Sequence, residues 1–272
     1  MIDWSHSAHS FETALALAKA SQAAYRKNST PAQWAAAQGF AVKGEFEQSN
    51  MFGFAAAQGD TLVVAFRGTD QLEDWGVNGN MDRKQIDGLP GTVHDGFWNQ
   101  GLQPLLPAVL AVLNGDTYRK IWITGHSLGG AIAVCLQSCL IFQHNRMVTG
   151  TYTFGQPRVG DAGFRDGLDA HTTGQYHRYV NHNDVVPLVP PYTFGYRHGG
   201  APVRFHRDGK AERHDGLLSR LHDQFEEQLD VLLSGRPSRN IAELLKDLRD
   251  KPTEGIREHA IEEYIGLIEK NV

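Results

Sequence analysis

The stretch from Ile121 to Phe142 constrains the fold of this chain more than any other part of the sequence. Residues Ile121 to Thr124 are mostly apolar and predict a buried strand, and a following apolar run without proline or glycine, Ala131 to Phe142, predicts a helix. Between them, Gly125-His-Ser-Leu-Gly129 fits the pattern G-x-S-x-G. Strand, tight turn and helix in this order are typical of a nucleophile elbow, a sharp turn that presents a reactive serine.

The residues of this turn fit that interpretation physically. Ser127 would sit in strained backbone at the apex, and Gly125 and Gly129 would leave room for strand and helix to pass closely. Backbone N–H groups at the start of the helix would point to the place where an oxyanion forms. The pattern alone is weak evidence, because a chain with 29 glycines can contain a Gly/Ser turn without chemistry. Its position between a strand and an apolar helix favours Ser127 as a nucleophile.

The order of the other apolar segments predicts the fold class. Strands alternate with helices through the middle of the chain, which indicates a mostly parallel α/β sheet. The expected strands are Thr61–Phe66, Ile121–Thr124, Thr151–Phe154, Tyr176–Asn181 and Val203–His206, with a hairpin of Ala41–Phe46 and Met51–Ala57 joined at Glu47–Asn50. The expected helices are Phe11–Tyr25, Phe97–Leu113 and Ala131–Phe142, followed by amphipathic helices around 218–232, 241–248 and 261–268. Gly101 and Pro104 indicate an irregularity within the second of these helices.

Bulk properties exclude several classes of protein. The net charge of −5 and the lack of a dense basic cluster argue against a nucleic-acid partner. No apolar run is long enough to span a bilayer, and no signal peptide is visible, so we expect a cytoplasmic protein or one exported without a cleaved signal. Cys135 and Cys139 lie four residues apart on one expected helix, which favours buried thiols over a disulfide. No zinc-ligand spacing accompanies His94, and we expect no metal or other cofactor.

A serine nucleophile needs a base and a carboxylate that orients the base. On a sheet of this kind these partners follow in the order serine, acid, histidine. Asp184 comes directly after the expected strand Tyr176–Asn181 and is the best acid by position. The alternative is an Asn/Asp turn that only ends the strand.

The base is harder to choose, because eight of the 13 histidines come after residue 150. His259 opens the last expected helix, where this topology usually supplies its histidine, but a surface histidine at a helix start is the alternative. His222 lies on an amphipathic helix and remains a competitor. The other six are His171, His177, His182, His198, His206 and His214.

Several blocks of the sequence together resemble the class 3 lipases, a family that includes fungal triacylglycerol lipases and feruloyl esterases. The blocks are Val64-Ala-Phe-Arg-Gly-Thr69, His94-Asp-Gly-Phe97, Gly125-His-Ser-Leu-Gly-Gly130, Thr153-Phe-Gly-Gln-Pro-Arg-Val-Gly-Asp161, Asn183-Asp-Val-Val-Pro187, Gly195-Tyr-Arg-His198, and His259 with Tyr264-Ile265. The resemblance implies an α/β-hydrolase fold with Ser127 as nucleophile, Asp184 as acid and His259 as base. It also implies an oxyanion hole formed by the backbone of Thr69 and Leu128.

The resemblance also implies a domain organisation. We expect one α/β-hydrolase domain over residues 1–272, with a lid at 70–90 and a helical cap at 215–250. Leu72, Trp75, Val77 and Met81 could form the apolar face of the lid. This segment is rich in glycine and asparagine, so a solvated loop is the alternative. The helices of the cap could equally be ordinary packing elements.

The expected function is therefore a serine ester hydrolase. Its substrate would be a lipid ester such as a triacylglycerol, met at an oil–water or membrane interface. A phospholipase A1 and a feruloyl-type esterase are enzymatic alternatives. A catalytically silent binding protein of the same fold is the alternative from another class, and the intact set of Ser127, Asp184, His259 and Thr69 disfavours it.

Overall fold

The computed structural model describes residues 2–4, 7–68, 81–182, 184–213 and 257–272. Its centre is a sheet of eight strands in the order β1-β2-β3-β6-β7-β8-β9-β10. Neighbours from β3 to β9 pair in parallel, whereas β1, β2 and β10 add antiparallel strands at the two edges. The predicted mostly parallel sheet is confirmed. The strands are β1 (Ala41–Gln48), β2 (Met51–Gln58), β3 (Thr61–Phe66), β6 (Lys120–His126), β7 (Gly150–Phe154), β8 (Tyr176–Asn181), β9 (Ala201–Phe205) and β10 (Ala211–Arg213).

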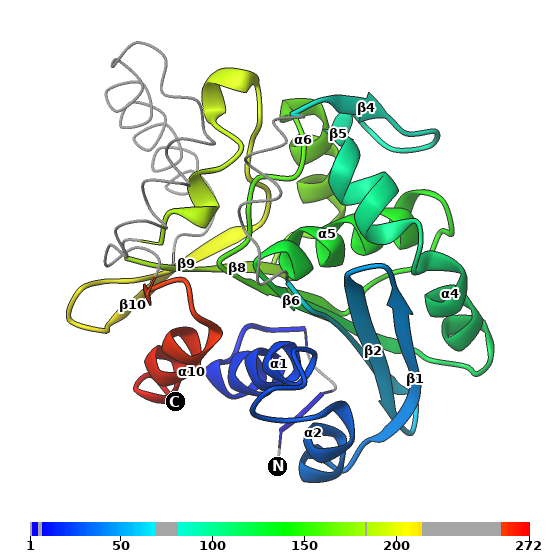
Figure 1. Cartoon of the computed structure of the whole chain (residues 1–272), viewed down its shortest axis with the longest axis vertical. Coiled ribbons are helices and arrows are strands. Elements are labelled where there is room, and N and C mark those ends of the chain that lie inside the picture. Colours follow the sequence, from blue (N-terminus) through cyan, green and yellow to red (C-terminus); the bar gives the residue numbers. More distant parts are fainter. Residues whose placement is uncertain (1, 5–6, 69–80, 183, 214–256) are drawn as a thin grey trace.

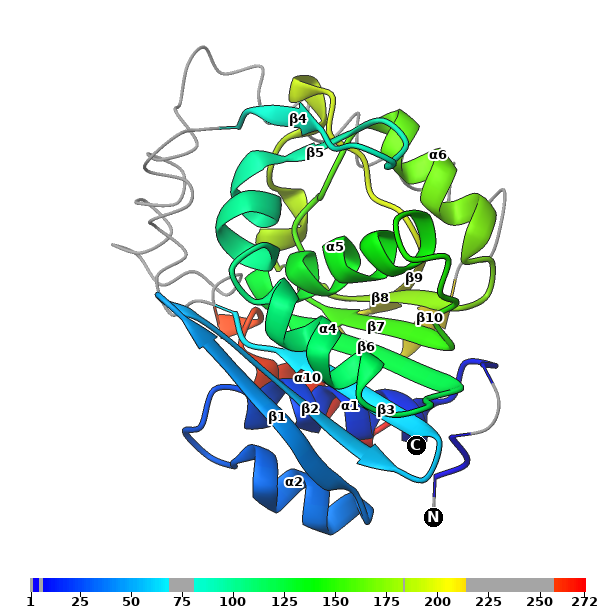
Figure 2. The same cartoon turned by 90° about the vertical axis from the view of Figure 1, so that its right-hand side faces the viewer.

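Helices cover both faces of this sheet (Figures 1 and 2). On one face lie α1 (Phe11–Ala23), α2 (Pro31–Gln38) and α10 (Ile261–Glu269). On the other lie the π-helix η1 (Gly96–Leu102), α4 (Leu106–Asn114), α5 (Leu128–Phe142) and α6 (Ala162–His171). Every residue of β3, β7 and β8 is buried, as expected for strands that are covered on both sides. A hydrophobic core therefore lies on each face of the sheet.

Short elements complete the architecture. The strands β4 (Arg83–Gln85) and β5 (Thr92–His94) form a separate two-stranded ribbon. Two 3-10 turns, η2 (Val186–Leu188) and η3 (Tyr192–Phe194), lie between β8 and β9. No helix of the described ranges is both long enough and apolar enough to cross a membrane.

Two predicted elements differ from the structure. The hairpin was expected to turn over Glu47–Asn50, but β1 extends to Gln48 and the turn is only Ser49 and Asn50. Two-residue hairpin turns favour positive φ, and Ser49 has a φ of 54°. The single helix expected over Phe97–Leu113 is instead η1 followed by α4. Its second half restarts because a proline fits the first turn of a new helix, as Pro107 does in α4.

Two helices, α2 and α6, were not predicted. Thr30 begins α2 with a capping box: its side chain accepts from the backbone of Gln33, and the side chain of Gln33 accepts from the backbone of Thr30. The side chain of Asp161 caps the N-terminus of α6 by accepting from the N–H of Phe164. Both caps are visible in the sequence as a polar residue before a short helical stretch.

The lid and cap expectations fall largely outside the described residues. Within the expected lid at 70–90, the structure describes residues 81–90, which contain β4 and the turn after it. Residues 70–80 and the whole expected cap at 215–250 lie outside the described ranges, as do the helices expected around 218–232 and 241–248.

Candidate active site

The elbow forms where β6 ends and α5 begins. Ser127 stands between them with a φ of 59° and a ψ of −127°, a conformation that non-glycine residues rarely adopt. A Cβ at Gly125 would lie 2.1 Å from the carbonyl oxygen of Gly129, and a Cβ at Gly129 would lie 2.3 Å from that of Phe66. Only glycine fits at either position, because strand and helix pass too closely for any side chain. The N–H of Ser127 donates to the carbonyl of Phe154 at 2.9 Å, which fastens the turn to β7.

Leu128 is the first residue of α5, so its N–H has no acceptor within the helix. It lies at the positive end of the helix dipole, beside the serine, where a developing negative charge would be stabilised. Gly68 also lies close to the serine, since a Cβ placed on it would lie 2.9 Å from Cβ of Ser127. The chain after β3 therefore passes directly beside the serine. Thr69, the other predicted oxyanion donor, lies outside the described residues.

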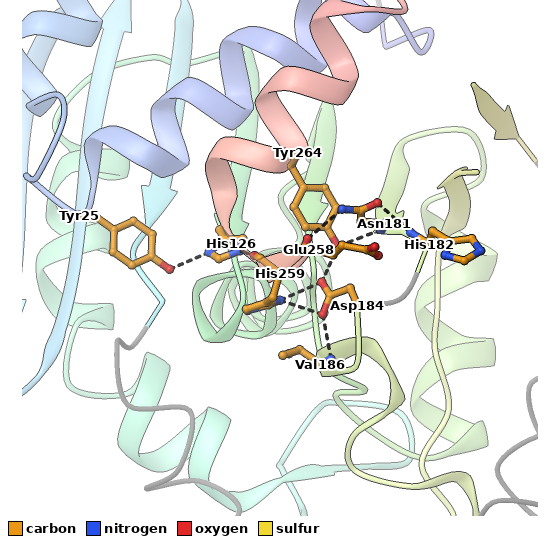
Figure 3. Close-up of polar contacts among 9 residues, drawn as sticks. All are labelled: Tyr25, His126, Asn181, His182, Asp184, Val186, Glu258, His259 and Tyr264. Carbon is orange, nitrogen blue, oxygen red and sulfur yellow. Dashed lines mark hydrogen bonds and ion pairs between the residues drawn. The ribbon is translucent and has the colours of Figure 1, made fainter. Parts of the chain in front are cut away.

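Asp184 and His259 meet although they are 75 residues apart in the chain. Nδ1 of His259 lies 2.8 Å from Oδ2 and 3.0 Å from Oδ1 of Asp184 (Figure 3). Asp184 follows β8, His259 precedes α10, and both side chains are buried. A carboxylate bonded to Nδ1 fixes the tautomer in which Nε2 carries the lone pair of a general base.

Other donors orient the carboxylate of Asp184. The hydroxyl of Tyr264 on α10 donates to Oδ2 at 2.6 Å, and the N–H of Val186 donates to Oδ1 at 2.9 Å (Figure 3). Burial, followed by the nearby charge of Asp184, raises the pKa of Tyr264 well above its usual value. The phenol therefore stays protonated and keeps donating to the carboxylate.

The serine hydroxyl and the outer nitrogen of the base complete the arrangement. Oγ of Ser127 and Nε2 of His259 are both buried, and neither has a hydrogen-bond partner within the described part of the chain. The ring of His259 lies 4.6 Å from the ring of His126, the neighbour of Ser127 in the elbow, so the base is held at the elbow. In an acyl transfer, a proton would pass from Oγ of Ser127 to Nε2 of His259. Catalytic hydrogen bonds of this kind are often long without substrate.

Gly155 packs directly against Asp184 and His259, a role that the sequence analysis did not predict. It follows β7 with a φ of +57°, and a Cβ there would lie 2.7 Å from Oδ2 of Asp184 and 2.8 Å from Nδ1 of His259. The position requires glycine twice, for its backbone and for its space. A glycine directly after a buried strand, in Thr153-Phe-Gly155, was the available signal.

The other candidate bases occupy different places. His198 is buried and donates from Nε2 to the carbonyl of Pro187 at 2.7 Å, while burial and nearby arginines lower its pKa well below its usual value. His206 faces Glu212 on an exposed edge, and His171 and His177 contact the carbonyls of Gly167 and Gly174. His214 and His222 lie outside the described residues. Of the histidines that the structure describes, His259 is the one bonded to Asp184.

His94, which could have suggested a metal ligand, has a structural role. Its ring stacks on Phe97 with 4.0 Å between centroids, and Nδ1 accepts from the N–H of Gly96 at 3.0 Å. Across the described ranges there is no cluster of three or more histidine, cysteine, aspartate or glutamate side chains that could hold a metal ion. Cys135 and Cys139 are buried free thiols, and burial raises the pKa of Cys139 to about 11.

Comparisons with known proteins agree with this fold. A family model for class 3 lipases matches residues 63–194, which hold the elbow and Asp184. A secreted mono- and diacylglycerol lipase of Fusarium solani is 36% identical over 141 residues, covering 50% of this chain and 41% of that protein. A triacylglycerol lipase of Arabidopsis thaliana is 36% identical over 218 residues, covering 60% of this chain and 42% of that protein. The chain thus matches less than half the length of either relative.

A solved structure extends the likeness over more of the chain. The lipase from Rhizopus microsporus var. chinensis superposes with a TM-score of 0.62 and 27% identity, covering 75% of this chain and 76% of that one. Its similarity agrees with the mostly parallel sheet flanked by helices. Over residues 63–194 the chain matches the class 3 lipase family, and the chain has the α/β-hydrolase fold.

Proposed function

We propose that this chain is a carboxylic-ester hydrolase, a triacylglycerol lipase or esterase that works through an acyl-enzyme. The observation that carries the proposal is the strained Ser127 at the elbow beside the hydrogen-bonded pair of His259 and Asp184. Strain of this kind persists only where the surrounding structure holds it, and it gathers at sites of chemistry. The relatives, a mono- and diacylglycerol lipase and a triacylglycerol lipase, support acylglycerols as the substrate class.

Acylation follows from the roles of three side chains. Nε2 of His259 takes the proton of Ser127 Oγ as that oxygen attacks the ester carbonyl. Asp184 holds the ring in place and stabilises the imidazolium that forms. The imidazolium then gives its proton to the departing alcohol, which leaves an acyl ester on Ser127.

The oxyanion of each tetrahedral intermediate needs donors. The N–H of Leu128, at the start of α5, supplies one, and we assign the N–H of Thr69 as the second. One such donor contributes on the order of 3 kcal/mol to the stability of the transition state. A water molecule, activated by His259, then attacks the acyl ester and releases the fatty acid by the same steps in reverse order.

We further propose that residues 1–272 form one catalytic domain that meets its lipid substrate at an interface. The two cores that share one sheet support a single domain. Activity against emulsified triacylglycerol that rises steeply above the solubility limit of the substrate is the expected result. A smooth saturation curve through that limit would count against an interface and leave the hydrolase chemistry in place.

The catalytic assignment is tested with Ser127→Ala. The variant should fold like the wild type and lose ester hydrolysis by roughly 10⁴-fold or more, measured with p-nitrophenyl esters. A serine-reactive phosphonate should label Ser127 of the wild type, as read by mass spectrometry of the tryptic peptide. Retention of most activity in Ser127→Ala, or labelling at another residue, would refute the proposal.

The substrate class is tested separately. Hydrolysis of p-nitrophenyl esters of increasing chain length should be compared with that of an emulsified triacylglycerol, a phosphatidylcholine emulsion and a feruloyl ester. Preference for the acylglycerol is the expected outcome. Preference for the phospholipid or for the feruloyl ester would instead assign the chain to one of the alternative esterase classes.

A further inference from the structure

His126, inside the elbow, bridges two segments that are far apart in the sequence. Its Nδ1 lies 2.7 Å from the hydroxyl oxygen of Tyr25, which comes just after α1. Its Nε2 lies 2.7 Å from the main-chain carbonyl oxygen of His259. Figure 3 shows the three residues side by side, with His126 in the middle. The side chain of His126 is buried, so it works here as an internal connection between Tyr25 and His259.

The two contacts determine which ring nitrogen of His126 carries a proton. A carbonyl oxygen only accepts hydrogen bonds, so Nε2 of His126 must carry a proton. In the neutral ring Nδ1 then has a lone pair, and it accepts from the hydroxyl of Tyr25. Burial lowers the pKa of His126 well below its usual value, and the nearby His259 adds to this effect. The ring is thus a neutral imidazole in one tautomer.

The contact matters because it holds the main chain of the proposed base. Asp184 fixes the ring of His259 from the Nδ1 side, but a ring can still move with its backbone. Nδ2 of Asn181 donates to the carbonyl of Glu258 at 2.9 Å, and His126 donates to the next carbonyl along the chain, that of His259. Two side chains therefore hold the main chain at the base: Asn181 at the end of β8 and His126 at the end of β6.

Tyr25 also reaches the nucleophile side. A Cβ placed on Gly68 would lie 2.4 Å from the hydroxyl oxygen of Tyr25 and 2.9 Å from Cβ of Ser127. The phenol thus lies between the segment after β3, the elbow and the ring that supports His259. The hydroxyl of Tyr25 thus lies beside Gly68, which adjoins Ser127, and beside His126, which holds His259.

We propose that Tyr25 and His126 form a positioning relay, the Tyr25–His126 relay, which fixes the main chain of His259 and so the distance from its Nε2 to Ser127. The relay does not touch the reacting atoms, and it acts through His259. The inference rests on the proposed function, because it concerns the base of the same site. Its effect belongs to the chemical step, so it changes kcat and leaves KM nearly constant.

Two substitutions of His126 distinguish the effect of its Nε2 hydrogen-bond donor from the effect of losing the ring. Glutamine places an amide N–H near the position of Nε2 and can still donate to the carbonyl of His259. Asparagine is shorter, places its amide near the position of Nδ1, and loses that donor. We expect His126→Asn to lower kcat about 100-fold and His126→Gln about tenfold, with KM within about twofold of the wild type. Equal losses in the two variants would overturn the role of the donor.

Tyr25→Phe removes the hydroxyl that donates to Nδ1 of His126, and it should lower kcat about tenfold. Tyr179→Phe is the matched control. The hydroxyl of Tyr179 makes a similar hydrogen bond, 2.6 Å long, to Nε2 of His9, and this bond does not involve His259. Both variants lose one tyrosine–histidine hydrogen bond, so their melting temperatures should fall by similar amounts. A loss of kcat in Tyr179→Phe as large as in Tyr25→Phe would reduce the relay to general stability and overturn the proposal.

One measurement does not depend on activity. In protein labelled with ¹⁵N-histidine and carrying Ser127→Ala, the His126 ring should show a protonated Nε2 and an unprotonated Nδ1 across neutral pH. Tyr25→Phe in the same background should keep the proton on Nε2, which the carbonyl of His259 requires, and should shift the Nδ1 resonance because its lone pair loses a donor. A protonated Nδ1 in the presence of Tyr25 would overturn the relay even if the hydrolase assignment holds. An inactive wild type with the expected tautomer would refute the proposed function alone.

Discussion

Gly155 is the residue that most directly tests how closely the Asp184–His259 pair is packed. We expect Gly155→Ala to lower kcat about 100-fold or more, since the new methyl group would need the space of Oδ2 of Asp184 and Nδ1 of His259. Gly59→Ala is a matched control with the same φ of +57° and, within the described residues, nothing within 4 Å of the added Cβ. It carries the same backbone strain, about 1 kcal/mol or more, without the clash. Ester hydrolysis and thermal unfolding of both variants decide the point, and equal losses of activity would contradict it.

The hydroxyl of Tyr264 tests the support of the carboxylate. A hydrogen bond to a charged group contributes about 1.5–3 kcal/mol, so Tyr264→Phe should lower kcat by about tenfold or more. Tyr176→Phe is the control, because its buried hydroxyl donates to the neutral side chain of Gln156 at 2.7 Å. That variant should lose stability and keep its kcat. If both variants keep full kcat in steady-state assays, Tyr264 does not support Asp184.

Much of the candidate site could be predicted from the sequence, because its main residues sit in local patterns. Ser127 is marked by the glycines around it, and Asp184 by its place after a buried strand. Spacing alone left His259 and His222 as competing bases, since proximity to Asp184 depends on how the last helix folds back, and the resemblance to class 3 lipases favoured His259. Tyr25 could not be predicted, because its partner His126 lies 101 residues further along the chain. Contacts of that kind follow from the packing of α1, not from any local pattern.

At the scale of single elements, the π-helix η1 depends on a neutral histidine at its start. Nδ1 of His94 accepts from the N–H groups of Gly96 and Phe97, at 3.0 Å and 3.3 Å. Protonation would replace this lone pair with an N–H and place a positive charge at a helix N-terminus, which is unfavourable. Burial accordingly lowers the pKa of His94 from 6.5 to about 4.

This capping contact predicts how stability depends on pH. Above pH 6.5 both folded and unfolded chains have a neutral His94. As pH falls from 6.5 to about 4, the unfolded chain binds a proton that the folded chain does not, so the free energy of unfolding decreases by about 3 kcal/mol. His94→Asn keeps an acceptor for Gly96 but does not titrate, so urea unfolding should show a shallower decrease over this range. Equal slopes in the two proteins would contradict this assignment.

The elements that the sequence predicted well are those with strong periodicity. Buried strands and α5 were predicted because their apolar runs have no competing interpretation. The break between η1 and α4 falls at Pro104, one of the two positions where the sequence indicated an irregular helix, although apolar periodicity continues through Leu102, Leu105 and Leu106. Packing decides it: a Cβ on Gly101 would lie 3.0 Å from Ile132 of α5, so η1 approaches α5 closely at a residue without a side chain.

At the scale of the whole molecule, the two cores share one sheet and should unfold together. Leu17 of α1 is fully buried in one core, and Leu136 of α5 is fully buried in the other. Each substitution to alanine should lower the free energy of unfolding by about 3 kcal/mol. Tryptophan fluorescence, circular dichroism and loss of activity should then shift together in urea titrations. Separate transitions for the two variants would indicate that the faces of the sheet unfold independently.

Tyr264 has a further consequence for how this chain can change over evolution. Its hydroxyl also accepts from the N–H of Asn181 at 3.0 Å, so α10 is fastened to the end of β8 as well as to Asp184. The preceding strand β10 pairs with β9 in the sheet. Both ends of the segment 214–256 are thus joined to fixed parts of the scaffold by bonds that do not involve it. Changes of sequence between these ends therefore leave the bonds of Tyr264 intact, so His259 can keep its place while the intervening sequence varies.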